Sequence, residues 1–203
     1  MILLASRSPQ RRALLGAHGV EFRVVVSRVD EGADPVLNAR LKAEDVAARV
    51  APPGLAPGDA VIGADTEVLL DGRTLGKAAD RAEAEAMLRA LSGRVHSVQS
   101  AVCIRTATAT REVLDETRVT FRPLTEGLLA WYLDGGEWRE RAGAYAIQGA
   151  GAALVERIEG SYATVVGLPV AALGAALEDL GLAPWDGAGG DGGILAATRE
   201  GGR

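Results

Sequence analysis

The sequence predicts an α/β protein built around a mixed β-sheet. Short apolar runs typical of strands alternate with segments whose apolar residues recur at helical spacing. Strand–helix–strand segments in the first part of the chain indicate crossover connections, whereas two long strand-like stretches in the middle, joined by a short turn, indicate a hairpin. A sheet that contains both kinds of connection is mixed rather than all-parallel.

Composition narrows the class of protein. The chain has 203 residues, which suits one domain or two small lobes. With 48% hydrophobic and 24% charged residues it is typical of a globular protein, and wholesale disorder is excluded. The net charge of −5 gives no overall attraction to nucleic acid or to an anionic membrane, so we expect neither partner. A single cysteine, Cys103, excludes an intrachain disulfide and favours a cytoplasmic protein.

The N-terminal part is expected to form a strand, a helix and a second strand. The apolar run at residues 2–5 predicts a buried strand. Ser8 followed by Pro9 is typical of a helix start, because serine caps the first N–H groups and proline suits the first turn. Gly19 is expected to end this helix, and residues 22–26 are expected to form the second strand.

A second helix is predicted to begin at Asp34-Pro35. The residues expected on its apolar face are Val36, Leu37, Leu41 and Val46. Two further strands are expected at residues 60–64 and 67–70, which places Asp65 at a strand end. Asp71-Gly72 then predicts a hairpin turn.

The remaining elements follow from the same signals. They are a helix over 80–91, strands over 94–106 and 112–121, a helix over 125–133, a glycine-rich loop to 151, a strand over 152–158 and a helix over 169–180. We expect residues 1–183 to form one domain and the glycine-rich residues 184–203 to form a flexible tail.

The segment Ser6–Arg12 is the first candidate for binding chemistry. It joins a strand to a helix N-terminus, where free N–H groups and the helix dipole favour an anion. Ser6, Arg11 and Arg12 add donors and positive charge, so the segment suits a phosphate chain. The alternative is a capped surface helix with solvated arginines.

Acidic side chains form the second candidate. Glu31, Asp65 and Glu67 could hold a divalent cation, or one of them could act as a base toward water. The alternatives are a solvated loop for Glu31 and a turn cap for Asp65. Lys77 could reach a phosphate as a point charge, although an exposed hairpin lysine is the commoner case. Gln148, in a loop flanked by glycines, offers an amide donor and acceptor suited to the edge of a base.

Seven segments together resemble the Maf family of nucleotide pyrophosphatases, in particular its branch acting on dTTP and UTP. These segments are Ser6–Arg12, Val29–Glu31, Gly63–Thr66, Leu75–Ala78, Leu91–His96, Ala142–Gly149 and Val166–Pro169. The resemblance implies two lobes around a cleft, a fold similar to that of inosine triphosphate pyrophosphatases, and a possible homodimer. It also implies hydrolysis of a nucleoside triphosphate to the monophosphate and pyrophosphate with a divalent cation, Mg, Mn or Co.

The resemblance also implies roles for individual residues. Asp65 matches the proposed catalytic base, with Glu31 and Lys77 as its catalytic partners. The residues implied in substrate binding are Ser6, Gln10, Arg11, Arg12, Thr66 and Gln148, and those implied in metal binding are Glu31, Asp65 and Glu67.

Three positions depart from the family pattern. Gln10 stands where this branch usually has arginine, Ala78 where proline is usual, and Ser161 where aspartate is common. Gln10 keeps a second substrate class open, namely modified or non-standard nucleotides. A third hypothesis is a nucleotide-binding regulator of cell division without catalysis. Release of pyrophosphate by the purified protein distinguishes the enzymes from the regulator.

Overall fold

A computed structural model describes residues 1–50 and 54–183 and confirms the mixed α/β fold. The expected tail at 184–203 lies outside the described residues. The seven-stranded sheet has the order β2-β1-β3-β5-β6-β7, and β4 pairs with β3. The strands are β1 (Ile2–Ala5), β2 (Phe22–Val24), β3 (Ala60–Leu70), β4 (Arg73–Leu75), β5 (Val95–Thr106), β6 (Thr110–Phe121) and β7 (Val155–Glu159). β1 is parallel to β2 and β3, and the other pairs are antiparallel.

Five of the described helices begin within one residue of the predicted start. The helices are α1 (Pro9–Ala17), α2 (Pro35–Val50), α3 (Arg81–Leu91), α4 (Glu126–Gly135), the 3-10 helix η1 (Gly149–Leu154), α5 (Tyr162–Val166) and α6 (Val170–Asp179). Ser8, Asp80 and Thr125 each accept a hydrogen bond from the backbone N–H three residues on, as expected of caps. The short helix α5, capped by Ser161, was not predicted. Nor was η1: the strand expected over residues 152–158 begins only at Val155, because the three residues before it belong to the 3-10 turn.

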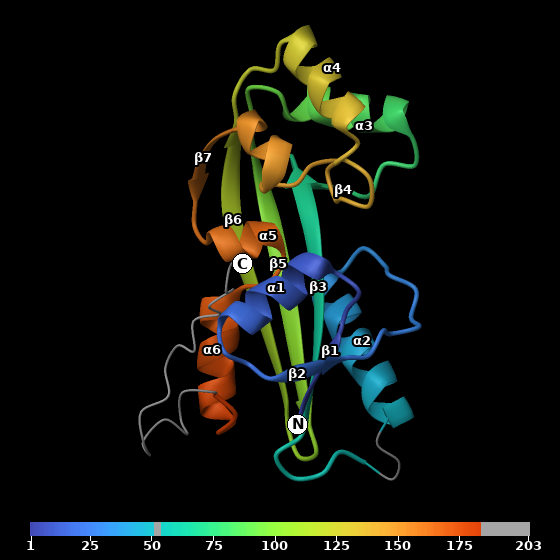
Figure 1. The fold of residues 1–203 in the computed structure, drawn as a ribbon, viewed down its shortest axis with the longest axis vertical. Helices are drawn as coiled ribbons and strands as arrows, with labels where there is room; N and C mark the ends of the chain where they lie inside the picture. The colour runs from blue at the N-terminus through green and yellow to red at the C-terminus, as the bar shows by residue number, and fades with distance from the viewer. Residues whose placement is uncertain (51–53, 184–203) are drawn as a thin grey trace, which may run out of the picture.

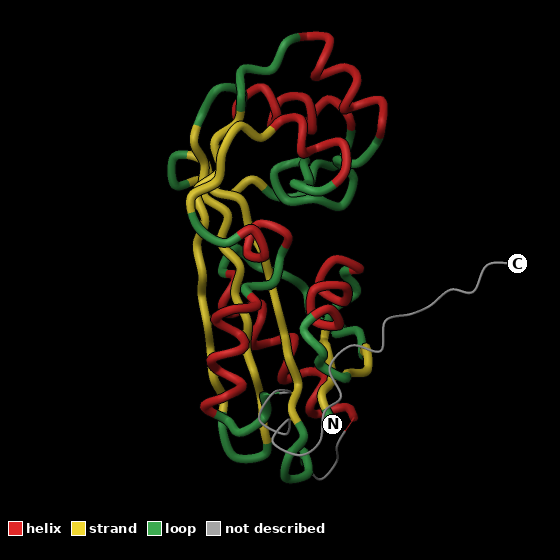
Figure 2. Tube along the Cα trace, turned by 60° about the vertical axis from the view of Figure 1, so that its left-hand side comes forward, coloured by secondary structure: helices red, strands yellow, loops and turns green. Residues whose placement is uncertain are grey.

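The long strands β3, β5 and β6 run the length of the molecule, with one group of helices around each half (Figures 1 and 2). In the lower half, α1 and α6 pack on one face of the sheet through Leu15, Leu173 and Leu177. Helix α2 packs on the opposite face through small residues such as Ala39 and Ala43. In the upper half, α3, α4 and η1 form a separate core with β3, β5 and β6. None of the described helices is long and apolar enough to cross a membrane.

The prediction of two strands interrupted at Asp65 was wrong. β3 is continuous from Ala60 to Leu70, and its ladder with β5 is unbroken from Ala60 to Leu69. Asp65 therefore lies in the middle of a strand and not at its end. The polar residues Asp65 and Thr66 interrupt the apolar pattern of the sequence but not the strand. Side chains from helices α1 and α2 form hydrogen bonds with them.

The predicted apolar face of α2 was also partly wrong. Leu37 and Leu41 are exposed. The buried residues of α2 are Pro35, Asn38, Ala39, Lys42, Ala43 and Val46. Helix α2 lies close to the sheet, so the face that it buries carries small side chains and the two polar residues that contact Asp65. The distribution of apolar residues alone does not identify this face.

We expect the protein to lose stability as the pH falls from about 6.5 to about 4, because His96 is buried as a neutral ring. His96 is 3% exposed and packs edge-on against Phe121 and Tyr145. Burial lowers its pKa to about 4. The unfolded chain has the higher histidine pKa and so binds the proton first, which costs up to about 3 kcal/mol.

Urea unfolding at several pH values, for the wild type and His96→Phe, measures this effect. The difference between the two proteins isolates His96 from the carboxylates and from the exposed His18. Parallel pH profiles for the two proteins would contradict the assignment.

Candidate active site

The candidate residues gather where one edge of β3 has no neighbouring strand. β1 pairs with β3 as far as Gly63, and β4 pairs with it from Val68. Among the described residues, no strand continues the ladder on this edge between those two positions. The Ala64 carbonyl accepts hydrogen bonds from Arg11 Nη1 at 3.0 Å and from Lys42 Nζ at 3.2 Å. Two cations thus converge on one backbone oxygen at the gap.

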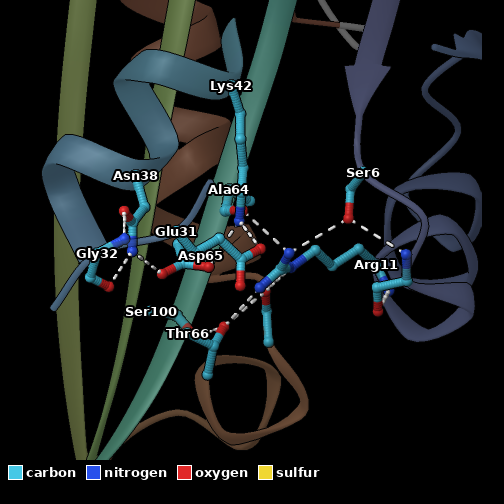
Figure 3. Close-up of polar contacts among 12 residues, drawn as sticks. Ser6, Arg11, Glu31, Gly32, Asn38, Lys42, Ala64, Asp65, Thr66 and Ser100 are labelled. Atoms are coloured by element: carbon cyan, nitrogen blue, oxygen red, sulfur yellow. Dashed lines mark hydrogen bonds and ion pairs between the residues drawn. The ribbon is translucent and has the colours of Figure 1, made fainter. Parts of the chain in front are cut away.

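Side chains from this part of β3 point to opposite faces of the sheet, because strand residues alternate. Asp65 lies on the face covered by α2, where it contacts Asn38 and Lys42. Thr66 lies on the other face, where it contacts Arg11 of α1. Figure 3 shows both groups beside the same stretch of strand.

Gly63 allows α2 to lie directly against β3. A Cβ atom at this position would lie 2.0 Å from the carbonyl oxygen of Ala39, which no side chain can tolerate. Because the helix approaches this closely, residues one position before and three positions after Ala39 reach the next inward-facing residue of the strand. Those residues are Asn38 and Lys42, and they contact Asp65.

Asp65 is held by two donors. Its side chain is 12% exposed. Oδ1 lies 2.7 Å from Lys42 Nζ, and Oδ2 accepts from Asn38 Nδ2 at 2.8 Å. Asn38 is itself fixed by the backbone of Gly32, donating to its oxygen and accepting from its nitrogen. The carboxylate therefore has a defined orientation, and each oxygen keeps a lone pair for a further ligand.

Lys42 connects Asp65 to Glu31. Its ammonium is buried and lies 2.7 Å from Glu31 Oε1 as well as 2.7 Å from Asp65. Glu31 also pairs with the exposed Lys77, at 3.5 Å. Partial burial opposes ionisation of Glu31, but the hydrogen bond and charge of Lys42, together with Lys77, hold its pKa below the usual value. Glu31, Asp65 and Lys77, predicted as catalytic partners, are thus in one ion-pair network.

Glu67 follows Asp65 on the same face of β3. Partial burial, with the nearby charges of Asp65 and Asp34, raises its pKa, and the hydrogen bond from Thr74 opposes this only in part. Within residues 1–50 and 54–183, no three His, Cys, Asp or Glu side chains form a ready-made metal cluster. The predicted metal ligands Glu31, Asp65 and Glu67 are therefore neighbours rather than a preformed cage.

Arg11 is the residue of the Ser6–Arg12 segment that reaches the strand. It donates to Ser6 Oγ at 3.2 Å, Gly167 O at 2.8 Å and Thr66 Oγ1 at 2.9 Å, in addition to Ala64 O. Burial lowers its pKa, while the charges of Asp65 and Glu31 oppose this. A guanidinium remains charged in any case.

The other predicted substrate residues lie farther from this network. Arg12 is exposed, and Gln10 accepts a hydrogen bond from Ser8 within its own helix start. Gln148 is exposed and precedes η1 without a capping hydrogen bond from its side chain. The structure does not bring Gln148 into contact with Thr66 or Asp65.

The loop of Gln148 is nevertheless well fixed. The carboxylate of Glu137 accepts hydrogen bonds from the N–H groups of Ala150 and Gly151. A Cβ at Gly151 would lie 1.8 Å from the Ala146 oxygen, so only glycine fits there. Gln148 therefore extends from an anchored backbone rather than from a loose loop.

Three residues of the site were not predicted: Asn38, Lys42 and Ser100. A signal existed for the first two, because polar residues four apart in a helix share a face, and here that face also carries Ala39, Ala43 and Val46. Ser100 is the β5 partner of Thr66 in the sheet register, and only the strand pairing identifies it.

The chain matches known proteins over most of its length. Residues 1–180 match the family model described as Maf-like protein. The chain is 44% identical to the dTTP/UTP pyrophosphatase of Pyrococcus horikoshii, covering 84% of this chain and 91% of that protein. It is 44% identical to the dTTP/UTP pyrophosphatase of Thermus thermophilus, covering 90% and 96%. A HAM1 protein from Coxiella burnetii superposes with a TM-score of 0.43 at 20% identity, covering 59% and 72%.

Proposed function

Because the chain belongs to the Maf-like protein family, we propose that it hydrolyses a nucleoside triphosphate, dTTP or UTP, to the monophosphate and pyrophosphate. The dTTP/UTP pyrophosphatases to which it is similar support this reaction. The observation that carries the proposal is the buried Asp65 carboxylate, which Lys42 and Asn38 orient on one face of the sheet. Arg11 binds the same stretch of β3 from the opposite face, through the Ala64 carbonyl.

The site contains matched charges. Arg11, Lys42 and Lys77 oppose Glu31, Asp65 and Glu67, so these six side chains supply no excess positive charge for a triphosphate. We infer that the triphosphate enters as its complex with a divalent cation, Mg, Mn or Co. Carboxylate oxygens suit such hard cations, and magnesium is commonly held by one or two carboxylates together with substrate phosphates. Glu31, Asp65 and Glu67 would hold the cation, which would neutralise charge on the phosphates.

In this mechanism Asp65 orients and deprotonates the attacking water. Lys42 and Asn38 hold the carboxylate still, which removes the need to reorganise it during the reaction. Ser6, Arg11, Arg12 and Lys77 hold the phosphate chain, and Thr66, Gln10 and Gln148 set the preference for the base.

A panel of nucleoside triphosphates tests the proposal. The protein is incubated with Mg, Mn or Co and with each of UTP, dTTP, CTP, ATP, GTP and a set of modified nucleoside triphosphates, and the products are separated. We expect monophosphate and pyrophosphate, formed fastest from UTP and dTTP. Diphosphate and orthophosphate would contradict the bond assignment. Higher rates on modified nucleotides would favour the second substrate class, and binding without turnover would favour the regulator.

Gln148→Glu is expected to lower kcat/KM for UTP and dTTP by about tenfold to a hundredfold, if Gln148 reads the base. Uracil and thymine present an N3–H donor beside carbonyl acceptors, which one amide can match. A carboxylate keeps the acceptor but loses the donor and adds negative charge. The UTP-to-CTP ratio of kcat/KM measures the effect.

Gln10→Arg is the companion variant, because it restores the residue usual in this branch. An unchanged UTP-to-CTP ratio in Gln148→Glu would remove Gln148 from base selection. A changed ratio in Gln10→Arg alone would assign selection to the helix start instead.

A further inference from the structure

A directed chain of hydrogen bonds leads from Arg11 to the backbone of α5. Arg11 Nη2 lies 2.9 Å from Thr66 Oγ1, Thr66 Oγ1 lies 2.8 Å from Ser100 Oγ, and Ser100 Oγ lies 2.7 Å from the Thr164 carbonyl oxygen. Figure 3 shows the Arg11, Thr66 and Ser100 part of this chain. The two hydroxyls in the middle could each donate or accept, so the direction must come from the ends.

The ends fix the direction. A guanidinium only donates and a carbonyl only accepts. Ser100 has a single proton and gives it to Thr164 O, so it can only accept from Thr66. Thr66 therefore donates to Ser100 and turns a lone pair toward Arg11. The alternative acceptor for Thr66, the Gly167 oxygen, is farther away at 3.4 Å.

We propose that Ser100 is a positioning residue for substrate binding, which acts through Thr66 to orient the Arg11 guanidinium. The inference rests on the proposed function. Ser100 is fully buried, so water cannot replace its hydroxyl without entering the core. Without it, the Thr66 proton has no good acceptor in place and the hydroxyl can rotate away from Arg11.

The orientation of Arg11 matters because nearly all its donors are already committed. Four hydrogen bonds, to Gly167 O, Ser6 Oγ, Ala64 O and Thr66 Oγ1, use four of the five N–H groups of a guanidinium. The remaining N–H is on Nη2, the nitrogen that Thr66 holds. Because the guanidinium is planar, its four hydrogen bonds together set the direction of this N–H, and the Thr66 bond is the one on the same nitrogen. Ser100 therefore supports the bond nearest to the one donor that Arg11 has left for a substrate oxygen.

A double-mutant cycle tests this assignment. Ser100→Ala is made in the wild type and in Thr66→Val, and kcat and KM are measured for UTP. We expect Ser100→Ala to lower kcat/KM by about threefold to tenfold in the wild type, mainly through KM, and by less than about twofold in Thr66→Val. Ser100→Thr keeps the hydroxyl and is expected to keep most of the wild-type kcat/KM.

Thr117→Val is the matched control. Thr117 is equally buried, lies on the neighbouring strand β6, and holds the start of α5 through hydrogen bonds with the backbone of Ser161, but it does not contact Thr66. We expect it to lower the melting temperature and leave the KM for UTP unchanged. Equal losses of kcat/KM from Ser100→Ala in both backgrounds, or a fall in melting temperature with unchanged KM, would overturn the proposal.

The same double-mutant cycle can be measured without turnover. Calorimetry gives the dissociation constant of magnesium–UTP for the wild type, the two single variants and the double variant. If the wild type binds UTP but does not hydrolyse it, the proposed reaction is overturned. The dissociation constants of the four proteins then still show whether Ser100 acts through Thr66. A wild type that neither binds nor hydrolyses any nucleotide would overturn both.

Discussion

Asp65→Asn is expected to lower kcat by about 10²–10⁴, because it removes the group that accepts the proton of the attacking water. Asparagine keeps the shape of the side chain but cannot take up a proton at neutral pH. KM should change far less than kcat if the residue acts mainly on the water. Steady-state kinetics with UTP or dTTP and each divalent cation measure both.

The structure also predicts the cost of this variant to stability. Asp65 accepts from Lys42 on one oxygen and from Asn38 on the other, whereas asparagine has only one acceptor oxygen. Asn38 cannot turn its own oxygen inward without losing its two bonds to Gly32. The amide nitrogen of the new asparagine then faces one of the two donors, Lys42 or Asn38, with no acceptor between them. Such an unpaired buried donor costs about 1–3 kcal/mol. The variant should therefore remain folded with a lower melting temperature.

Asp45→Asn is the control, because it also replaces one carboxylate by an amide but does so outside the site. Asp45 lies on the same helix as Lys42 and pairs with Arg49, away from the site. We expect nearly unchanged turnover for Asp45→Asn. Near-normal kcat in Asp65→Asn would show that another group activates the water.

Lys42→Met is expected to destabilise the protein by about 3–5 kcal/mol and to reduce turnover severely. Lys42 is the shared partner of two carboxylates and donates to the Ala64 carbonyl as well. Methionine fills a similar volume but leaves Asp65, a nearly buried charge, with Asn38 as its donor. Breaking a buried pair from one side costs more than the pair contributes, because the remaining charge is uncompensated.

Chemical unfolding of Lys42→Met, Asp65→Asn and the double variant measures this energy. If the cost comes from the stranded carboxylate, adding Asp65→Asn to Lys42→Met should recover part of the lost stability. Arg40→Met is the matched control, since Arg40 pairs with Glu112 on the exposed side of α2. Additive losses in the double variant would show that Lys42 acts through packing alone.

The local features of this protein can be derived from its amino-acid sequence. Most strands and helix starts follow from short-range patterns, and Ser8 caps its helix as predicted. The motif segments were enough to identify the family, which the match over residues 1–180 confirms. These features depend on residues close together in the chain, so the sequence carries them directly.

The hydrogen-bond and charge partners of the buried polar residues depend instead on how distant elements pack together. Asp65 interrupts an apolar pattern and was predicted to end a strand, yet it lies in mid-strand because α2 packs close enough for Lys42 and Asn38 to neutralise and hold it. The close approach depends on Gly63 meeting Ala39, a contact between elements that no local pattern specifies. Ser100 reaches Thr66 only through the register of β3 and β5. Burying a polar group is unfavourable until its partner is in place, and that partner is supplied by the fold.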